Sequence, residues 1–320
     1  MGFIPRMIFW LALACLIPAW ASAGNMLLND HPLAGRIWDM RHRTFIDESA
    51  LLSRSNVADV LLLGETHDNP LHHELQQKLL IARIAASGES QFKPALMMEQ
   101  FNIDDQQALN QELNKSDRET ALNHITDLIS FADKNVYQPL VSLAVENNLP
   151  IIAANIPGKL AQPVIWRGFA AYDAAELKRL AVAEVWSDER QKYLSENMGG
   201  AHCGKLRDEL REGLTRGQRL RDALMVDSAI SSIENGIIAI VGSSHARRDI
   251  GLPLYFAARA PTSKIFSVGF IEVNPNVTDP LAYEANSATG EIPYDAIWFT
   301  PRKERANPCA ELEETKGTQL

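Results

Sequence analysis

The segment LLLGETHDNPLHHE, residues 61–74, brings carboxylates and imidazoles together directly after an apolar run. The side chains in it that could take part in chemistry include Glu65, His67, His72 and His73. Such groups can bind a metal ion that activates water, transfer protons, or hold a larger cofactor. The segment therefore raises the question of which other residues share its site.

A second segment, VGSSH (residues 241–245), has the same form: a glycine follows an apolar run and a histidine stands three residues later. Gly64 and Gly242 give the backbone freedom to turn sharply at the end of a strand. Either His67 or His245 alone would be interpreted as an ordinary hydrogen-bonded loop residue. Because the two motifs match, we expect both histidines to serve one site.

Glu99 comes directly after the apolar run ALMM. An unpaired carboxylate is costly in such surroundings, so we expect a partner, for which His67, Arg247 and a metal ion are the candidates. A divalent ion held by His67, Glu99 and His245 is one alternative. With Glu65 beside it, that ion could activate water as in a metal-dependent hydrolase.

Two familiar hydrolase signatures do not fit the sequence. HHELQ lacks the spacing of the HExxH zinc site, and GSSH is not the GxSxG elbow of serine hydrolases. His72 and His73 fall in the first turn of a helix predicted to be exposed. We therefore expect a solvated pair, with at most one imidazole turned inward.

Ligands of an open parallel sheet bind outside the carboxyl ends of its strands, so the residues directly after the apolar runs are the most informative. Gln218 and Asp222 lie four residues apart on the helix that leads into the run GIIAIV, and would share one face. An exposed, solvated face is an equal alternative for that pair. The predicted strand-end pocket comprises Glu65, His67, His73, Glu99, Asn155, Gln218, Asp222 and His245.

Six short apolar runs are predicted to be strands: residues 60–63, 95–98, 150–154, 236–241, 265–270 and 296–299. Each is apolar nearly throughout, as burial on both faces of a parallel sheet requires. Helix-length segments separate them, and Asn69 with Pro70 predicts the start of the first. The pattern predicts an α/β fold with a mostly parallel sheet flanked by helices and a smaller inserted all-helical subdomain.

The domain boundaries follow from the long stretch without a convincing strand. It shows helical patterns at residues 173–184, 187–198 and 206–234, and is too long for a loop. We predict an α/β domain of residues 24–157 and 236–302, a helical subdomain of residues 158–235, and a flexible tail of residues 303–320.

The first residues are typical of a secretory signal peptide, since Arg6 precedes an apolar run that ends in the small residues ASA, with cleavage expected after Ala23. Removal of residues 1–23 changes the net charge from −9 to −10, because Arg6 is their only charged residue. An acidic chain is not expected to bind nucleic acid. No later run approaches the ~20 apolar residues of a membrane span.

The cysteines bear on export and on redox state. Leu11 and Leu13 stand four and two residues before Cys15, whereas a lipoprotein signal has a leucine three residues before. We therefore expect export to the periplasm, with lipoprotein anchoring as the second choice. Cys203 and Cys309 could form one disulfide in that oxidising compartment, and free buried thiols are the equal alternative.

Taken together, these residues resemble the ChaN family of haem-binding uptake proteins, a branch of the wider Tiki and TraB group whose hallmarks are paired GxxH motifs and a glutamate. The resemblance runs from about Gly35 to Arg259 through GETHDNPLHHELQ, MMEQF, YQPL, AANIP, QRLRDALM and VGSSHARRDIGLPL. The family's parallel sheet and smaller helical domain agree with the fold predicted above.

The resemblance implies a homodimer around two stacked haems, with a tyrosine on each iron and a histidine and a lysine of the opposite subunit on the propionates. The candidate ligands are Tyr137, in the YQPL motif, and Tyr193, which precedes His202 and Lys205. A phenol with an ordinary pKa of about 10 needs a nearby cation or imidazole to ionise. Arg190 or His202 could serve Tyr193 in this way.

Two functions remain open. The first is a periplasmic haem-binding protein, not an enzyme, that receives haem from an outer-membrane receptor. The alternative is a Tiki-like metal-dependent hydrolase built on the strand-end glutamates and histidines. A scaffold that keeps the pocket without any chemistry is a third interpretation.

Overall fold

The computed structural model describes residues 25–88, 93–131, 133–201, 203–284, 287–306 and 309. The predicted signal peptide, residues 1–23, lies outside the described residues. The same holds for residues 310–320 of the predicted tail.

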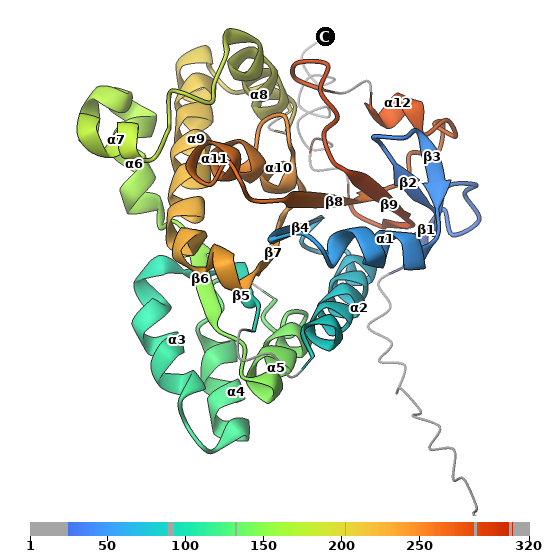
Figure 1. The fold of residues 1–320 in the computed structure, drawn as a ribbon. Helices are drawn as coiled ribbons and strands as arrows, with labels where there is room; N and C mark the ends of the chain where they lie inside the picture. Colours follow the sequence, from blue (N-terminus) through green and yellow to red (C-terminus); the bar gives the residue numbers. More distant parts are fainter. Residues whose placement is uncertain are drawn as a thin grey trace, which may run out of the picture.

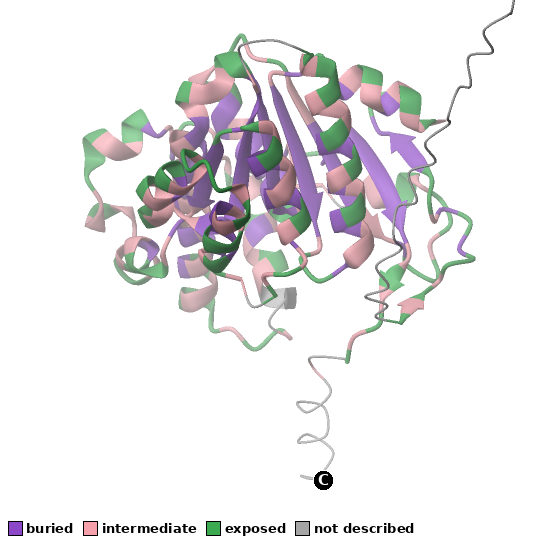
Figure 2. Ribbon diagram, turned by 90° about the horizontal axis from the view of Figure 1, so that it is seen from below, coloured by how far each residue is buried: buried purple, intermediate pink, exposed green. Residues whose placement is uncertain are grey.

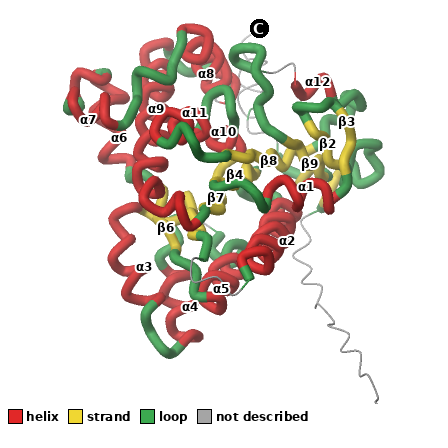
Figure 3. The backbone as a smooth tube through the Cα atoms, in the orientation of Figure 1, coloured by secondary structure: helices red, strands yellow, loops and turns green. Residues whose placement is uncertain are grey.

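Six parallel strands form the centre of an eight-stranded sheet. They are β4 (Val60–Glu65), β5 (Ala95–Asn102), β6 (Ile151–Asn155), β7 (Ile237–Gly242), β8 (Ile265–Glu272) and β9 (Ala296–Thr300). Their order is β9-β8-β4-β7-β5-β6. Each covers all of one predicted apolar run or all but its first residue, so the mostly parallel sheet is confirmed. Figure 3 shows the strands gathered between helices.

Two short antiparallel strands complete one edge of the sheet. β2 (Ile37–Asp39) pairs with β9 and with β3 (Thr44–Ile46), and the sequence analysis predicted neither. A separate two-stranded sheet joins β1 (Met26–Leu27) to β10 (Arg302–Lys303), with Met26 opposite Lys303. The start and the end of the folded chain therefore lie side by side.

One face of the sheet packs against helices from the first half of the chain (Figure 1). They are α1 (Glu48–Ser55), α2 (Pro70–Ser87), α3 (Gln106–Leu113), α4 (Arg118–Asp127) and α5 (Gln138–Asn147). Leu61 and Leu63 of β4 point to this face, while Val60 and Leu62 point to the other. This alternation explains why every residue of β4 is buried, as Figure 2 shows for the central strands.

The other face carries α6 (Gly158–Arg167), α9 (Asp208–Ala229) and α11 (Leu252–Arg259), whose side chains share a core with the strands. Between α6 and α9 lie α7 (Ala174–Arg179) and α8 (Asp188–Ala201), and α10 (Ser243–Ala246) and α12 (Leu281–Glu284) follow later. The described residues of the stretch 158–235 are thus helical or irregular. Whether that stretch is a separate subdomain stays a prediction.

A disulfide joins Cys203, between α8 and α9, to Cys309, across 106 residues of sequence. Of the two alternatives for these cysteines, a disulfide or free buried thiols, the structure has the disulfide. Just before it in the chain, Arg305 makes ion pairs with Asp68 and Glu272. The last described residues are therefore fastened to the body of the protein at two points. Among the described helices, none is long and apolar enough to cross a membrane.

Candidate functional site

The carboxyl ends of β4, β7 and β5 meet at one edge, because the three strands are neighbours in the sheet. Glu65 is paired in register with Gly242, and the backbone N–H of Gly242 donates to Glu99 Oε2 at 2.7 Å. Three segments far apart in sequence thus converge. The strand-end residues form two buried clusters, one on each face of the sheet.

The first cluster surrounds Glu65, whose side chain is buried on the α2 and α5 face. The Tyr137 hydroxyl donates to Glu65 Oε1 at 2.7 Å, and Gln100 Nε2 donates to the same oxygen at 3.2 Å. Gln76 Nε2 donates to Oε2 at 2.8 Å, and His67 Nδ1 lies 2.8 Å from Oε1. Four side chains thus hold the two carboxylate oxygens of Glu65 in place.

His72 and His73 are both buried, so the expectation of a solvated pair is wrong. Asn69 caps α2 as predicted, and the first turn lies against the strand ends rather than in water. His72 accepts from the Thr66 N–H at 2.8 Å, and burial lowers its pKa to about 3. His73 Nδ1 lies 3.3 Å from Glu65 Oε2 without the geometry of a hydrogen bond.

The second cluster lies on the α9 face. His245 sits between two carboxylates: its Nε2 is 3.4 Å from Glu99 Oε1, and its Nδ1 is in close contact with Asp222 Oδ1. Gln218 Nε2 lies 3.0 Å from His245 Nδ1. All but Gln218 are almost fully buried. The predicted shared face of Gln218 and Asp222 is therefore turned inward rather than solvated.

These contacts set the charge of the second cluster. Burial alone would lower the pKa of His245, but Glu99 and Asp222 outweigh it and raise that pKa to about 10. Burial alone would raise the pKa of Glu99, but the charge of His245 brings it down to about 2. Burial raises the pKa of Asp222, which His245 opposes. Glu99 and His245 therefore form a buried ion pair.

His67 links the two clusters. It bonds to Glu65, while its Nε2 lies 3.1 Å from where a Cβ would stand on Gly242, beside Glu99. Burial works against its protonated form, yet Glu65 and Glu99 together raise the pKa of His67 above its ordinary value. Its side chain is 44% exposed and packs edge-on against Phe131. His67, Glu99 and His245 are thus neighbours.

Asn155 lies apart from both clusters, at the end of β6. Its Nδ2 donates to Asn102 Oδ1 at 2.8 Å, and its Oδ1 accepts from Arg221 Nη2 at 2.7 Å. Arg247, proposed above as a partner of Glu99, instead pairs with Asp249 through two hydrogen bonds of 2.9 and 2.7 Å. Asn155 and Arg247 thus bond to other residues of this edge.

The divalent-metal alternative finds no support in this geometry. Within the described ranges, no group of three or more His, Cys, Asp or Glu side chains is arranged to hold a metal ion. His67 and His245 each pair instead with a carboxylate, His67 with Glu65 and His245 with Glu99.

The two candidate tyrosines have different surroundings. Tyr137 is buried, and burial together with Glu65 raises its pKa far above the ordinary value. Tyr193, on α8, is partly exposed, and the Arg247 guanidinium lies 5.0 Å from its ring centroid. Burial raises the pKa of Tyr193, while Arg247 opposes that rise.

The cation that lies over the Tyr193 ring is Arg247, which the sequence analysis did not name for this role. Arg190 bonds instead to the carbonyls of Asp249 and Val185 and to Glu291. His202 lies outside the described residues. Lys205 is exposed in the segment between α8 and α9.

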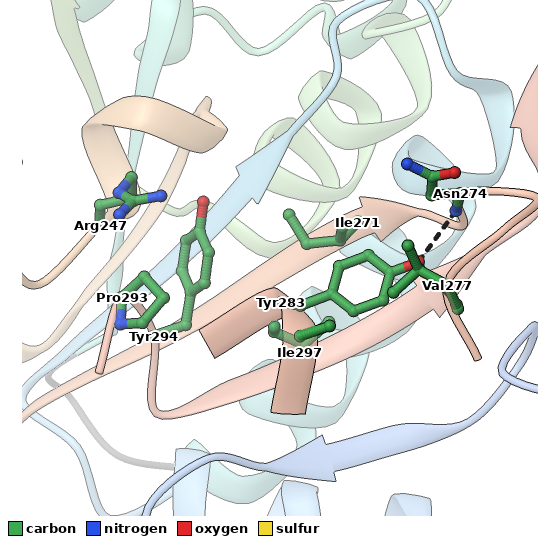
Figure 4. A pocket seen from close by; sticks show the side chains of 9 residues that line it. Arg247, Ile271, Asn274, Val277, Tyr283, Pro293, Tyr294 and Ile297 are labelled. Atoms are coloured by element: carbon green, nitrogen blue, oxygen red, sulfur yellow. Dashed lines mark hydrogen bonds between the residues drawn. The ribbon is translucent and has the colours of Figure 1, made fainter. Parts of the chain in front are cut away.

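A cavity of about 220 Å³ opens beside the second motif, with Arg247 on its wall. Figure 4 shows Arg247 and Tyr294 at one end and Tyr283 at the other. The Tyr294 hydroxyl donates to the Ser243 carbonyl at 3.0 Å, which fixes that wall to α10. Apart from Arg247 and Asn274, the residues that line the cavity are aromatic or apolar, and none of the lining residues belongs to the two buried clusters.

Sequence reasoning missed several residues that build the site. Gln76 follows His72 and His73 by about one helical turn, and its position on their face was a usable signal. Gln100 follows Glu99 in the same strand, so its side chain must point to the opposite face of the sheet. No sequence signal pointed to Asp249, because its partner Arg247 was considered only as a partner of Glu99.

Comparison with known proteins places the chain among haem proteins. Residues 51–256 match the family described as haem-binding uptake, Tiki superfamily, ChaN. The fold is similar to that of ChaN of Campylobacter jejuni, solved with cofacial haem binding (TM-score 0.65, 19% identity, 82% of this chain and 95% of that one). A mutant of the erythromycin esterase EreC matches with a TM-score of 0.40 and 11% identity over 80% and 94% of the two chains. No curated protein matches the sequence.

Proposed function

Because the chain belongs to the ChaN family of haem-binding uptake proteins in the Tiki superfamily, we propose that it is a periplasmic haem-binding protein of a haem or iron uptake system. The family match carries this proposal, since it spans both GxxH motifs and the helices between them. The Campylobacter protein, described as binding haem cofacially, supports the same ligand.

Tyr193 is the iron ligand in this proposal. An anionic oxygen ligand favours ferric iron. A tyrosine phenol becomes such a ligand only when it loses its proton. Tyr193 is partly exposed and has Arg247 beside it, so it can meet an iron and has a cation to favour its anion. Tyr137 fits poorly, because its hydroxyl is buried and already donates to the carboxylate of Glu65.

The contacts of the opposite subunit to the haem propionates are proposed from the resemblance to the ChaN family. Lys205 is exposed and cationic, as a contact to a haem propionate requires. His202 is the other propionate contact that the resemblance implies. Two such chains would enclose two stacked haems, and the haem would thus hold a homodimer together.

The place of action is proposed from the signal-like first residues. Export to the periplasm would put the protein where an outer-membrane receptor delivers haem. Lipoprotein anchoring remains the second choice, because the leucine spacing before Cys15 is unfavourable. A periplasmic location is also consistent with the disulfide between Cys203 and Cys309.

A haem titration tests the proposal. Purified protein should shift the Soret band on addition of ferric haem, saturating at about one haem per chain, with a spectrum typical of high-spin tyrosinate ligation. Tyr193→Phe should lose that spectrum, and Tyr137→Phe, the matched control, should keep it. Light scattering should show a larger mass after loading.

The outcomes separate the parts of the proposal. No spectral change in the unaltered protein would contradict haem binding itself. A Tyr193→Phe spectrum identical to the original would leave haem binding standing and rule out this ligand. A mass that haem does not change would contradict the haem-linked dimer alone.

A further inference from the structure

We propose that Arg247 is a positioning residue for haem ligation: it holds the Tyr193 phenol in place and balances the negative charge of the ligating oxygen. This inference rests on the proposed role of Tyr193. It also assigns a function in haem binding to the segment of the second GxxH motif. That motif ends at His245, and Arg247 follows two residues later.

Arg247 is placed over Tyr193 in a way that suits this role. Its guanidinium carbon lies 5.0 Å from the centroid of the Tyr193 ring, within the range of a cation–π contact. Such a contact restricts the rotation of the ring as well as favouring charge. Because Tyr193 lies on α8 and Arg247 follows α10, the contact joins the helical stretch to the edge of the sheet.

Arg247 is itself held firmly. Its Nε and Nη2 donate to the two carboxylate oxygens of Asp249, which is fully buried. Asp249 Oδ2 also accepts from the Ala288 N–H at 2.8 Å, and its carbonyl accepts from Arg190 Nε at 2.8 Å. A guanidinium bound at two points to a fixed carboxylate has little freedom to leave Tyr193.

The backbone around Arg247 is held by its neighbours in the chain, His245 of the second GxxH motif and Gly251. The Gly251 N–H donates to the Arg247 carbonyl at 2.8 Å, and a Cβ on Gly251 would lie 2.2 Å from the His245 carbonyl oxygen. Only glycine allows so close an approach. His245 is clamped between Glu99 and Asp222, so the buried cluster anchors the turn that presents Arg247.

The charges beside Tyr193 make the role testable, because they act in opposite directions. Arg247 favours the ionised phenol, whereas the carboxylate of Asp249 disfavours it. If Arg247 acts by charge, removing Arg247 and neutralising Asp249 should have opposite effects on haem binding, because an asparagine at position 249 keeps one oxygen that accepts from Arg247 while it removes the opposing negative charge. If the pair serves only to hold the turn together, both changes should weaken binding.

The experiment compares Arg247→Met, Arg247→Lys and Asp249→Asn with the unaltered protein, all as full mature chains. Ferric haem affinity and the phenolate-to-iron absorption band are measured at one neutral pH. Loss of a charge-assisted contact predicts about 10-fold weaker binding and a weaker band for Arg247→Met. Arg247→Lys should recover part of the loss, and Asp249→Asn should bind at least as tightly as the original.

Arg248→Met is the matched control. Arg248 is on the same turn but pairs with Asp295 and the Ile265 carbonyl, so its loss should leave the spectrum unchanged. Thermal unfolding of each haem-free variant shows whether the fold survives. If Arg247→Met does not fold, Arg247→Lys and Asp249→Asn still decide the question through the direction of their effects.

Equal losses in Arg247→Met and Asp249→Asn, or an Arg247→Met protein with unchanged affinity and band, would overturn the inference. Tyr193→Phe separates this failure from that of the proposed function. If Tyr193→Phe loses the tyrosinate spectrum while Arg247→Met keeps it, only the role of Arg247 is wrong. If Tyr193→Phe keeps the spectrum, the ligand assignment is wrong and the role of Arg247 is lost with it.

Discussion

Gly64 packs directly on Ala246: a Cβ added at position 64 would lie 2.7 Å from the Cβ of Ala246. Gly64 begins the first GxxH motif, and Ala246 follows the last residue of the second. The first motif therefore packs closely on Ser243 of the second motif and on the alanine that follows it. This contact lets the buried clusters on the two faces of the sheet share one edge.

Gly64→Ala should destabilise the protein more than Gly242→Ala. The first change forces a Cβ against backbone and Ala246, at a cost of about 1–3 kcal/mol for overpacking. The second places a Cβ 3.1 Å from His67 Nε2, and the partly exposed imidazole has room to move. Urea unfolding of both variants measures the difference. Equal losses, or the reverse order, would show that this edge packs differently.

Tyr137→Phe should cost about 1.5–3 kcal/mol of unfolding free energy, because a buried carboxylate loses a hydrogen-bond donor. The hydroxyl is 2.7 Å from Glu65 Oε1, and the phenylalanine ring fills the same space. The measurement is chemical denaturation of the haem-free protein. Ser142→Ala on the exposed side of α5 is a suitable control and should change stability little. A Tyr137→Phe protein as stable as the original would mean that Glu65 does not depend on this bond.

The free energy of unfolding should fall as the pH rises from about 6.5 towards 10. The folded pKa of His245 is raised to about 10 from 6.5, so its contribution is complete below 6.5 and is lost as the pH rises through 10. One proton changes the slope by at most about 1.4 kcal/mol per pH unit. Urea unfolding at several pH values should show this slope in the original protein and a flatter one in His245→Gln. The same slope in both would refute the assignment.

Reduction of the Cys203–Cys309 disulfide should lower stability by about 4–5 kcal/mol in the loop-entropy model, because the bond closes a loop of 106 residues. Thermal unfolding with and without a reductant checks this. The double variant Cys203→Ser and Cys309→Ser should unfold at the lower temperature in both conditions. A reductant effect that persists in the double variant would have another cause.

The parallel strands were predictable because burial on both faces leaves an unbroken apolar run, as in VLLL and GIIAIV. β2 and β3 were missed because each has only three residues, too few to show a period. Such strands are defined by their pairing, β2 with β9 and β3 with β2, which no local signal reveals.

The site was predictable in outline for the same reason. Knowing that β4, β5 and β7 are parallel is enough to bring His67, Glu99 and His245 to one edge. The partners were harder, because tertiary packing decides them. His72 and His73 read as solvated from helix position alone, yet the first turn of α2 is covered by strand ends. The sequence allowed Arg247 to pair with Glu99, whereas in the structure Arg247 pairs with Asp249, two residues away.

The pairing of Met26 with Lys303 has a practical consequence for rearranging the gene. Since the first and last described strands touch, a short linker could join them while the chain is reopened in a surface loop elsewhere. New termini between α3 and α4, where residues 114–117 are exposed, would lie far along the chain from both GxxH loops. Such a circularly permuted protein offers a way to attach a fluorescent reporter of haem capture without extending either natural end.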